Sequence, residues 1–478
     1  MSHPTPEPLG HRSEEELLAG LPPVRAVPAE RVAAAIGGRR LVLLDDDPTG
    51  TQTVVGLPVL TTWTVEDLRW ALRQDSTAFF VLTNTRSLDR DAAAERNRQI
   101  VRALVEASRA EGVDVVLASR SDSTLRGHFP LETDVLADEL AAAGAGDIDG
   151  VVVAPAYIEA GRLTVDSLHW MRTAEGMLPV GESEFAKDAT FGYVNSRLPE
   201  WIEEKTAGRT KAADVVRITL EDLRVGGPER VAELGTLRDR RTASADAVCD
   251  DDLRVLALGL AQAEAAGARL LYRIAPSFVR AGAGQAARAP LTAAEIGAPA
   301  APHGLIVVGS HVGLTTRQLD RLRADGGLAE FELDVHQLLD EGRRAAHIAE
   351  VTRAAADAMA AQDVVVRTTR TVITGEDADA SLAIARSVSA ALVETVRAIT
   401  AARTPAFVVA KGGITSSDTA TEGLRIRRAW ARGTLLPGIV LLWEPVEGPA
   451  AGIPYIVFAG NVGDDDAFAH AVRLLRSR

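Results

Sequence analysis

The stretch LVLLDDDPTGTQT, residues 41–53, indicates how the chain folds. Its four consecutive apolar residues predict a strand buried on both faces, which is typical of parallel sheets covered by helices. The strand leads directly into Asp45, Asp46 and Asp47, followed by Pro48-Thr49-Gly50. Asp, Pro and Gly are ordinary turn residues, but three adjacent carboxylates repel one another. The stretch therefore raises the question of whether these acids form only a turn or part of a ligand site.

The same strand pattern recurs along the chain, alternating with amphipathic helical segments. In the first half, strands are expected at 40–47, 78–87, 114–123 and 150–157, and helices at 64–74, 89–110 and 132–145. In the second half, strands are expected at 304–312, 363–369, 406–413 and 455–463, and helices at 315–324, 380–399 and 416–426. This alternation predicts two α/β domains with mainly parallel sheets and an active-site cleft between them.

Length and composition divide the chain further. A chain of 478 residues is too long for one ordinary core. Residues 280–303 are rich in Ala, Gly and Pro without a clear period, as expected of a linker. We therefore expect a loose N-terminal leader at 1–38, a first domain at 39–279, this linker, and a second domain at 304–478.

Charge and cysteine content narrow the class of protein. The net charge of −14 argues against general attraction to nucleic acid or to an anionic membrane. A single cysteine, Cys249, excludes an intrachain disulfide. The polar, acidic N-terminal segment has no apolar signal core, and no apolar run of 18 residues occurs that could span a membrane. These features lead us to expect a cytoplasmic protein without nucleic-acid or membrane partners. The oligomeric state stays open, a homodimer included.

Polar residues follow each predicted strand of the first domain. They are Asp45–Asp47, Asn84–Ser87, Arg120–His128, and a segment that contains Glu159 and Arg162. An arginine fork binds two oxygens of a carboxylate or phosphate, and an aspartate accepts a hydrogen bond or proton from a hydroxyl. Each cluster alone could be an ordinary loop or helix cap. Because ligands of open α/β sheets lie beyond the carboxyl ends of the strands, four clusters at one edge favour a binding site.

The strand ends of the second domain are rich in glycine and hydroxyl residues instead. They are Gly309–His311, Lys411–Ser417 and Gly460–Gly463. Such loops present backbone N–H groups to phosphates, although they also serve as simple turns and caps. The chain lacks the P-loop, the dinucleotide-binding GxGxxG and the protein-kinase motifs. HExxH and CxxC are absent too, and the nine histidines are scattered, which argues against a zinc site.

Six short motifs, in this order, give the chain a resemblance to the four-carbon acid sugar kinases. They are DDPTG at 46–50, SDSTLRG at 121–127, APAYIEAGRLT at 154–164, GSH at 309–311, KGGITSSD at 411–418 and AGNVG at 459–463. Each motif is short, but the ordered set is specific and spans roughly residues 40–470. The resemblance implies a substrate-binding domain followed by a nucleotide-binding domain. It also implies an ATP-dependent phosphotransferase with an alcohol acceptor, the terminal hydroxyl of a threonate, erythronate or 3-oxo-tetronate.

The resemblance also implies site residues. Substrate contacts fall on Asp46, Asp47, Arg86, Arg120, Ser121, Asp122 and Ser123. Nucleotide contacts fall on Ser310, Gly412, Gly413, Ile414, Thr415 and Gly460. Many relatives carry an acid where this chain has Ile414, so the resemblance assigns no metal ligand here. Asp45 matches no contact of the family and is expected to face solvent or cap the turn.

The residues suggest how phosphoryl transfer would proceed. We expect Arg86, with Arg126 or Arg162, to hold the substrate carboxylate, and Asp122 or Asp47 to accept the hydroxyl proton. We further expect the loop from Lys411 to Ser417 to hold the phosphates, with the lysine neutralising charge and Mg²⁺ bridging the phosphate oxygens. The alternative is a non-catalytic sensor or binding protein for an acidic metabolite. An NAD-dependent dehydrogenase is disfavoured because GxGxxG is missing.

Overall fold

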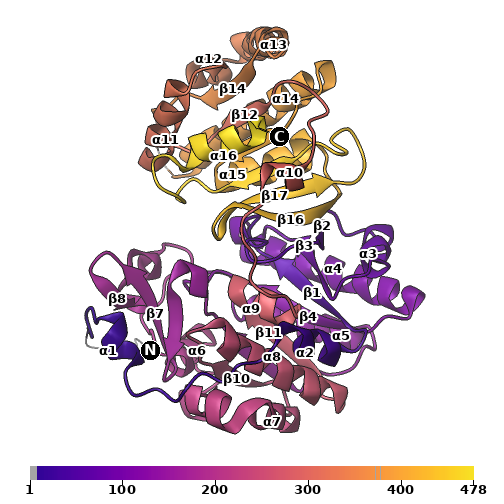
Figure 1. Ribbon diagram of the computed structural model, residues 1–478, viewed down its shortest axis with the longest axis vertical. Coiled ribbons are helices and arrows are strands. Elements are labelled where there is room, and N and C mark those ends of the chain that lie inside the picture. Colours follow the sequence, from indigo (N-terminus) through magenta and orange to yellow (C-terminus); the bar gives the residue numbers. More distant parts are fainter. Residues whose placement is uncertain (1–7, 372, 377, 478) are drawn as a thin grey trace. The chain divides into compact units, whose positions relative to one another are not determined.

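A computed structural model describes residues 8–371, 373–376 and 378–477, and the chain forms two compact units (Figure 1). The first unit ends at Arg288 and the second begins at Ala289. This boundary lies within the stretch expected to be a linker, which also contains the end of helix α9 (Pro276–Gly282) and helix α10 (Ala293–Ile296). Both units are α/β, as the alternation of strands and helices predicts.

The first unit is built on a parallel sheet with the strand order β2-β3-β1-β4-β11-β5-β10-β9. The strands are β1 Arg40–Asp45, β2 Leu57–Leu60, β3 Ala78–Leu82, β4 Val115–Arg120, β5 Gly150–Ala154, β9 Val216–Ile218, β10 Arg241–Ala245 and β11 Leu270–Ile274. Residues 41–45 of the stretch LVLLDDDPTGTQT lie in β1, which has β3 and β4 as its neighbours. Its alternate residues are buried on both faces, which is why it reads as an unbroken apolar run.

Helices cover both faces of this sheet. On one face, α3 (Val65–Leu72), α4 (Arg90–Glu111) and α5 (Leu131–Ala142) share a buried apolar cluster with Val42 and Leu44 of β1. Helix α4 begins where Asp89 caps the backbone N–H of Ala92 at 2.9 Å and ends at the left-handed Gly112. Towards the other face, α9 packs against β1, and α8 (Asp250–Ala265) packs against both α9 and α2 (Ala29–Ile36).

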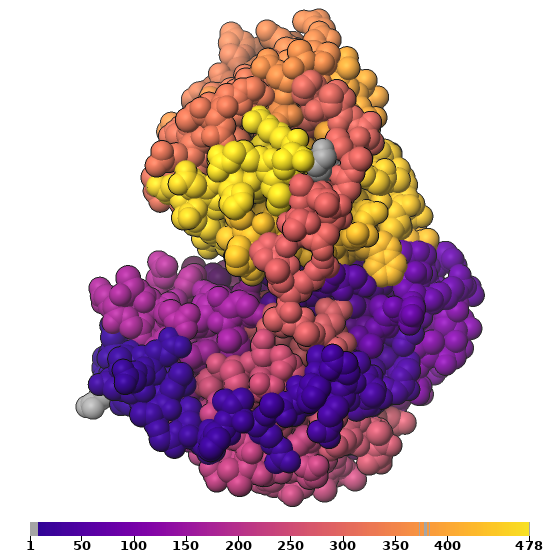
Figure 2. Space-filling model, in the orientation of Figure 1, coloured from indigo at the N-terminus to yellow at the C-terminus, as the bar shows by residue number. Residues whose placement is uncertain are grey.

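The described part of the N-terminal segment belongs to the first unit. It contains α1 (Glu14–Leu18) and α2, and Figure 2 shows it in indigo along the outside of this unit. Helix α2 buries Val32 and Ile36. Just before it, the backbone N–H of Val27 donates to Oδ1 of Asp251 in α8 at 3.1 Å. These contacts tie residues that were expected to be a loose leader to the core of the unit.

A small antiparallel sheet follows β5 and was not among the predicted elements. It consists of β6 (Arg162–Val165), β7 (Leu168–Thr173) and β8 (Gly176–Pro179), in that order. Its first turn places Asp166 and Ser167 at positive φ, 50° and 64°, as a tight hairpin turn requires. The sheet carries Arg162, so it places one of the expected site residues.

The second unit contains a mixed sheet with the order β13-β14-β12-β15-β18-β17-β16. The strands are β12 Leu305–Val308, β13 Leu328–Leu333, β14 Asp363–Thr368, β15 Val408–Lys411, β16 Arg428–Leu436, β17 Ile439–Pro445 and β18 Tyr455–Phe458. The first five strands in this order are parallel, whereas β17 is antiparallel to both of its neighbours. The β16–β17 hairpin was not predicted, because no helix separates its strands.

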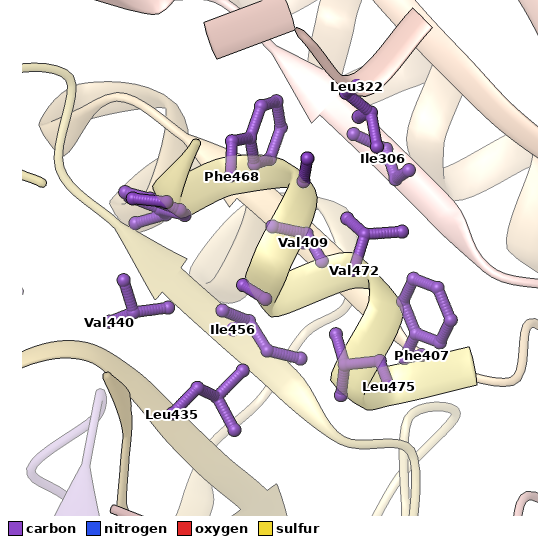
Figure 3. Packing of buried hydrophobic residues seen from close by; sticks show 14 of the residues in the cluster. Ile306, Leu322, Phe407, Val409, Leu435, Val440, Ile456, Phe468, Val472 and Leu475 are labelled. Carbon is purple, nitrogen blue, oxygen red and sulfur yellow. The ribbon is translucent and has the colours of Figure 1, made fainter. Parts of the chain in front are cut away.

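Helices pack on this second sheet as well. They include α11 (Gly313–Ala324), α13 (Glu341–Ala358), α14 (Ala378–Ala402), α15 (Gly413–Asp418) and α16 (Ala467–Arg476). Figure 3 shows Phe468, Val472 and Leu475 of α16 among side chains of the sheet, including Val409 and Ile456. Within the described ranges, no helix is long and apolar enough to cross a membrane.

Candidate active site

In the first unit, the residues that follow β1, β3 and β4 meet at one edge of the sheet. The three strands are parallel neighbours, so their carboxyl ends coincide. Asp45, the last residue of β1, pairs in register with Arg120, the last residue of β4. The backbone N–H of Asp46 continues this pairing and donates to the Arg120 carbonyl at 3.2 Å. This geometry brings three of the predicted polar clusters together.

Asp45 and Arg120 form the inner layer of this edge. They are only 2% and 3% exposed, and the Arg120 guanidinium donates to the Asp45 carboxylate. The same Nη2 atom donates to the Asp47 carbonyl at 2.9 Å. Of the two roles expected for Asp45, facing solvent is wrong, because an arginine from the next strand holds it inside. Its Oδ1 does accept from the backbone N–H of Asp47 in the turn, at 3.4 Å. Arg120, expected as a substrate contact, instead fixes the DDDPTG turn from within.

The burial of this pair has two consequences. Burial raises the pKa of Asp45 to about 7, although the positive charge of Arg120 opposes that shift. The turn also passes so close to the pair that a Cβ atom on Gly50 would collide with both side chains. Position 50 therefore requires a glycine, because the turn backbone lies too close to the Asp45 and Arg120 side chains for a Cβ atom.

Arg86 forms the next layer and connects two of the aspartates. Its Nε donates to Oδ2 of Asp46 at 3.1 Å, its Nη2 donates to Oδ1 at 2.5 Å, and its Nη1 lies 3.6 Å from Oδ2 of Asp47. The Asp46 side chain is 2% exposed, whereas that of Asp47 is 25% exposed. Burial alone would raise the pKa of Asp47, but Arg86 and hydrogen bonds from Thr49 outweigh it and lower the pKa. Asp47 is therefore the acid of this turn that is ionised and open to a ligand.

The segment after β4 presents a second acid. Asp122 accepts a hydrogen bond of 2.7 Å from Nε of Arg126, and Thr124 donates to the same carboxylate oxygen. Burial opposes ionisation of Asp122, but the nearby charges of Arg86 and Arg126 prevail and hold its pKa well below the usual range. Arg126 also lies 3.6 Å from Asp188, an acid that the sequence did not single out.

Ser121 and Ser123, expected as substrate contacts, turn inward. They are 2% and 5% exposed. The Ser121 hydroxyl lies 3.0 Å from that of Ser119, and the Ser123 carbonyl accepts from the buried His169 at 2.7 Å. Both residues therefore shape the loop that carries Asp122.

Arg162, on β6, has donors to spare. Its Nη1 donates to the Ala160 carbonyl at 2.9 Å, and its buried Nε has no hydrogen-bond partner among the described residues. Burial lowers its pKa, and the charge of Asp122 opposes that shift, which places the two groups within electrostatic reach. Of the three arginines expected to bind a carboxylate, Arg162 is the one with a buried side-chain donor that has no hydrogen-bond partner among the described residues.

Sequence reasoning missed several supporting residues. Glu132 accepts hydrogen bonds from Thr85 at 2.6 Å and Ser119 at 2.9 Å, below the strand ends. Arg273, in the apolar strand β11, donates to the carbonyls of Asp122 and Arg126 at 3.4 and 3.3 Å. Arg273 could have been found from the sequence, because it is a charged residue inside an apolar strand. Glu132 could not, because acids in the first turn of a helix are common.

In the second unit, the ends of β12, β15 and β18 form a separate cluster. Thr315 donates both to the Ser310 hydroxyl and to the Gly460 carbonyl, each at 3.0 Å. Gly412 has a φ of +127°, and a Cβ there would lie 3.0 Å from the Thr415 hydroxyl and 3.2 Å from Cβ of Ser310. The structure therefore brings four of the six residues expected to contact nucleotide side by side. They are Ser310, Gly412, Thr415 and Gly460.

The other two residues of this set lie at the start of α15. Gly413 has open space where a side chain would be, and Ile414 is 68% exposed. The helix begins directly after β15, three residues earlier than expected. The first N–H groups of a helix have no partner within it, so this exposed backbone suits an anionic ligand.

Lys411 does not belong to this surface. Its side chain is fully buried, its Nζ donates to the Ala459 carbonyl at 2.8 Å, and it lies 3.7 Å from the ring centroid of Phe458. Strand alternation explains this position, because Lys411 shares a face of β15 with the core residue Val409. The expectation that Lys411 neutralises phosphate charge is therefore not met by its placement. Burial also lowers its pKa to about 7.

Arg370 is the cation that lies beside these loops instead. It donates to the Ser310 carbonyl and, at 2.9 Å, to the Thr316 hydroxyl. The sequence gave no reason to choose it, because it follows β14 in a segment without glycine. His311, in the same region, bonds to the Thr369 carbonyl at 3.0 Å.

A cavity of about 940 Å³ opens beside the glycine loops of the second unit. Gly309, Ile414 and Thr415 line one side, and apolar residues of α14 line another. Its size and mostly apolar lining suit a cofactor-sized ligand. Within the described ranges, no three His, Cys, Asp or Glu side chains are grouped so as to hold a metal ion.

Comparison with known proteins assigns each of the two units to a known domain family. Residues 41–282 match a family model described as a sugar-binding N-terminal domain, and residues 305–468 match one described as a nucleotide-binding C-terminal domain. This pair of domains is the architecture of the four-carbon acid sugar kinases, and the chain belongs to that family. The resemblance drawn from the six motifs is thereby confirmed.

Individual relatives cover nearly the whole chain. A D-threonate kinase of Bordetella bronchiseptica is 28% identical over 455 residues, which are 93% of this chain and 99% of the relative. A solved structure of a Haemophilus influenzae protein has a TM-score of 0.62 at 19% identity, covering 91% of this chain and all of the other. A Salmonella typhimurium structure, described as a putative tRNA synthase, has a TM-score of 0.64 at 18% identity, covering 91% and 99%. These two structures share the fold.

Proposed function

We propose that the protein is an ATP-dependent kinase that phosphorylates the terminal hydroxyl of a four-carbon sugar acid of the threonate, erythronate or 3-oxo-tetronate type. The similarity to a D-threonate kinase supports this substrate class. The observation that carries the proposal is a group of charged side chains in the first unit, in which Arg86 acts on both Asp47 and Asp122 and Arg162 lies within electrostatic reach of Asp122. It combines acceptors for hydroxyls with an incompletely used guanidinium.

In this proposal, Arg162 binds the substrate carboxylate. Its unpartnered Nε supplies one donor, and a carboxylate accepts two parallel bonds from a guanidinium. Arg126 is already bound to Asp122 and near Asp188, and Arg86 is bound to Asp46. These two arginines therefore act chiefly by holding the acids in place.

Asp47 and Asp122 are the two candidates for the general base. The pKa of each is lowered, so each is ionised at neutral pH and ready to accept a proton. Arg86 lies 3.6 Å from the Asp47 carboxylate, and its charge lowers the pKa of both Asp47 and Asp122. The substrate hydroxyl would donate its proton to one of them as its oxygen attacks the γ-phosphorus, while the bond from that phosphorus to the β–γ bridging oxygen breaks and ADP leaves.

The nucleotide would bind in the second unit, with its phosphates on the loops around Ser310 and Gly412–Thr415 and its nucleoside in the adjoining cavity. Mg²⁺ bound to the phosphates would neutralise charge there. The hydroxyls of Ser310 and Thr415 fit this arrangement as oxygen donors, and since no three acids are grouped among the described residues, the phosphates would supply most ligands. In-line transfer then depends mainly on positioning.

An ADP-release assay with a panel of four-carbon sugar acids tests the proposal. At least one acid should stimulate ADP release well above the rate with ATP alone. A matched panel of the corresponding four-carbon sugar alcohols, which lack the carboxylate, should give little stimulation. No stimulation by any acid would leave the protein as a binding protein or sensor.

A further inference from the structure

The cavity of the second unit contains an acid that no step of the proposed transfer uses. Asp418 lines the cavity together with Thr415, which lies three residues before it on the same helix. Three residues of α-helix rise about 4.5 Å, or just under one turn. The Asp418 carboxylate therefore lies about one turn along the cavity wall from the loop proposed to hold the phosphates.

The surroundings of Asp418 give it few donors. The Ser389 hydroxyl, from α14, donates to its Oδ2. No lysine, arginine or histidine of the described residues forms an ion pair with it. Burial raises its pKa, and the charge of Glu422 adds to that shift, whereas Ser389 opposes it. The carboxylate thus has acceptor capacity left for a ligand with hydroxyl donors.

Much of the remaining cavity wall is apolar, although Arg386 and Arg397 line it as well. Ile384, Val388 and Leu392 of α14 line it, spaced as one face of the helix. Such a surface suits the flat ring of a nucleobase. Two other acids, Glu394 and Glu422, also line the cavity, but both are exposed to solvent, whereas Asp418 is half-buried and oriented by Ser389.

We propose that Asp418 binds the ribose 2′ and 3′ hydroxyls of the nucleotide, with the base against the apolar face of α14. The proposal rests on the proposed function, because it assumes that the phosphates lie at Gly412–Thr415. A vicinal diol offers two donors, and a carboxylate offers two oxygens to receive them. Ser389 holds one oxygen of this carboxylate, and both residues line the cavity.

Binding of nucleotide analogues by the full-length protein tests the proposal without sugar acid present. Titration calorimetry would compare MgATP with its 2′-deoxy and 3′-deoxy analogues. Each deoxy analogue lacks one hydrogen bond to the charged Asp418 carboxylate. The wild type should therefore bind each analogue roughly 10-fold more weakly than MgATP. In Asp418→Ala, MgATP should weaken by a similar or larger factor, and the difference between ATP and the deoxy analogues should vanish.

Glu422→Ala is the matched control, since it removes a neighbouring cavity acid and should keep the discrimination. Equal binding of all three nucleotides by the wild type would overturn the proposal, and this comparison needs no variant to fold. Persisting discrimination in Asp418→Ala would also overturn it. A wild type that binds no ATP would contradict the proposed kinase function itself, whereas ATP binding without discrimination would leave that function standing.

Discussion

Arg120 and Asp45 form a buried ion pair that contacts the backbone of the DDDPTG turn at Gly50. The pair comes from the ends of two adjacent strands, and the same arginine donates to the Asp47 carbonyl at 2.9 Å. These contacts fix the distance of the turn from the sheet. They thereby also fix the position of the Asp47 carboxylate.

Gly50→Ala tests the importance of this distance. The added methyl group collides with both members of the ion pair, so the turn must move outward and carry Asp47 with it. We expect kcat/KM for the sugar acid to fall roughly 100-fold, as for a displacement of about 1 Å in a reacting group. Gly235→Ala is the control, because its Cβ would lie 3.4 Å from its nearest neighbour, Cβ of Ala263. Equal kcat/KM in both variants would show that the turn tolerates displacement.

Arg162→Met tests which arginine binds the substrate carboxylate. The change removes the unpartnered Nε but preserves most of the side-chain volume. Steady-state kinetics should show KM for the sugar acid raised roughly 10- to 100-fold, while KM for ATP stays unchanged. Arg98→Met, which removes a half-buried arginine of α4 paired with Glu95 and Glu139, should behave as wild type. An unaltered KM in Arg162→Met would move the assignment to Arg126 or Arg86.

Asp47→Asn and Asp122→Asn separate the two candidate bases. The true base should lose roughly 10² to 10⁴ in kcat, because an amide cannot accept the proton. Replacement of the other acid should change mainly KM for the sugar acid. Single-turnover measurements at saturating ATP and sugar acid would report the chemical step. A residue whose asparagine variant retains near-normal kcat is excluded as the base.

How much of this site follows from sequence depends on what surrounds each residue. Strand ends are visible in a sequence, so the meeting of Asp46, Arg86 and Asp122 could be predicted from apolar runs and their polar ends. The inward direction of Asp45 could not, because it depends on Arg120 lying opposite it in the next strand. Sequence periodicity likewise does not show that Ser121 is turned inward by the pairing of its backbone with β11.

The second unit shows the same limit. Glycine loops that follow strands indicated the cluster of Ser310, Gly412 and Gly460. Lys411 was read as part of its loop, although it is the last residue of β15 and follows the strand's alternation into the core. Arg370 lies beside Ser310 only because β14 and β12 are adjacent in the sheet, which no local pattern shows.

Lys411→Met tests the buried position of this lysine through pH. Burial lowers its pKa to about 7 in the folded chain, against 10.5 when exposed. The unfolded chain therefore binds one more proton between these values, so stability should rise with pH by about 1.4 kcal/mol per unit across pH 7 to 10. Below pH 7 the stability gained from the neutral amine is lost, because the buried Lys411 amine is then protonated in the folded chain as well.

Chemical denaturation from pH 6 to 10 would show the effect as a rising free energy of unfolding for the second unit. Lys411→Met should flatten this rise and leave MgATP affinity within about 2-fold, since the side chain lies outside the phosphate loops. A steep loss of ATP affinity, with the pH dependence intact, would place the lysine at the nucleotide.

The central claim is the transfer of a phosphoryl group to the terminal hydroxyl of a four-carbon sugar acid. The most direct measurement is the proton-coupled ³¹P NMR spectrum of the product formed from ATP and threonate, erythronate or 3-oxo-tetronate. We expect a phosphomonoester signal split into a triplet by the two protons of a terminal CH₂ group, appearing with ADP in equal amounts. A spectrum with ADP and inorganic phosphate alone, or an ester signal split by a single proton, would contradict it.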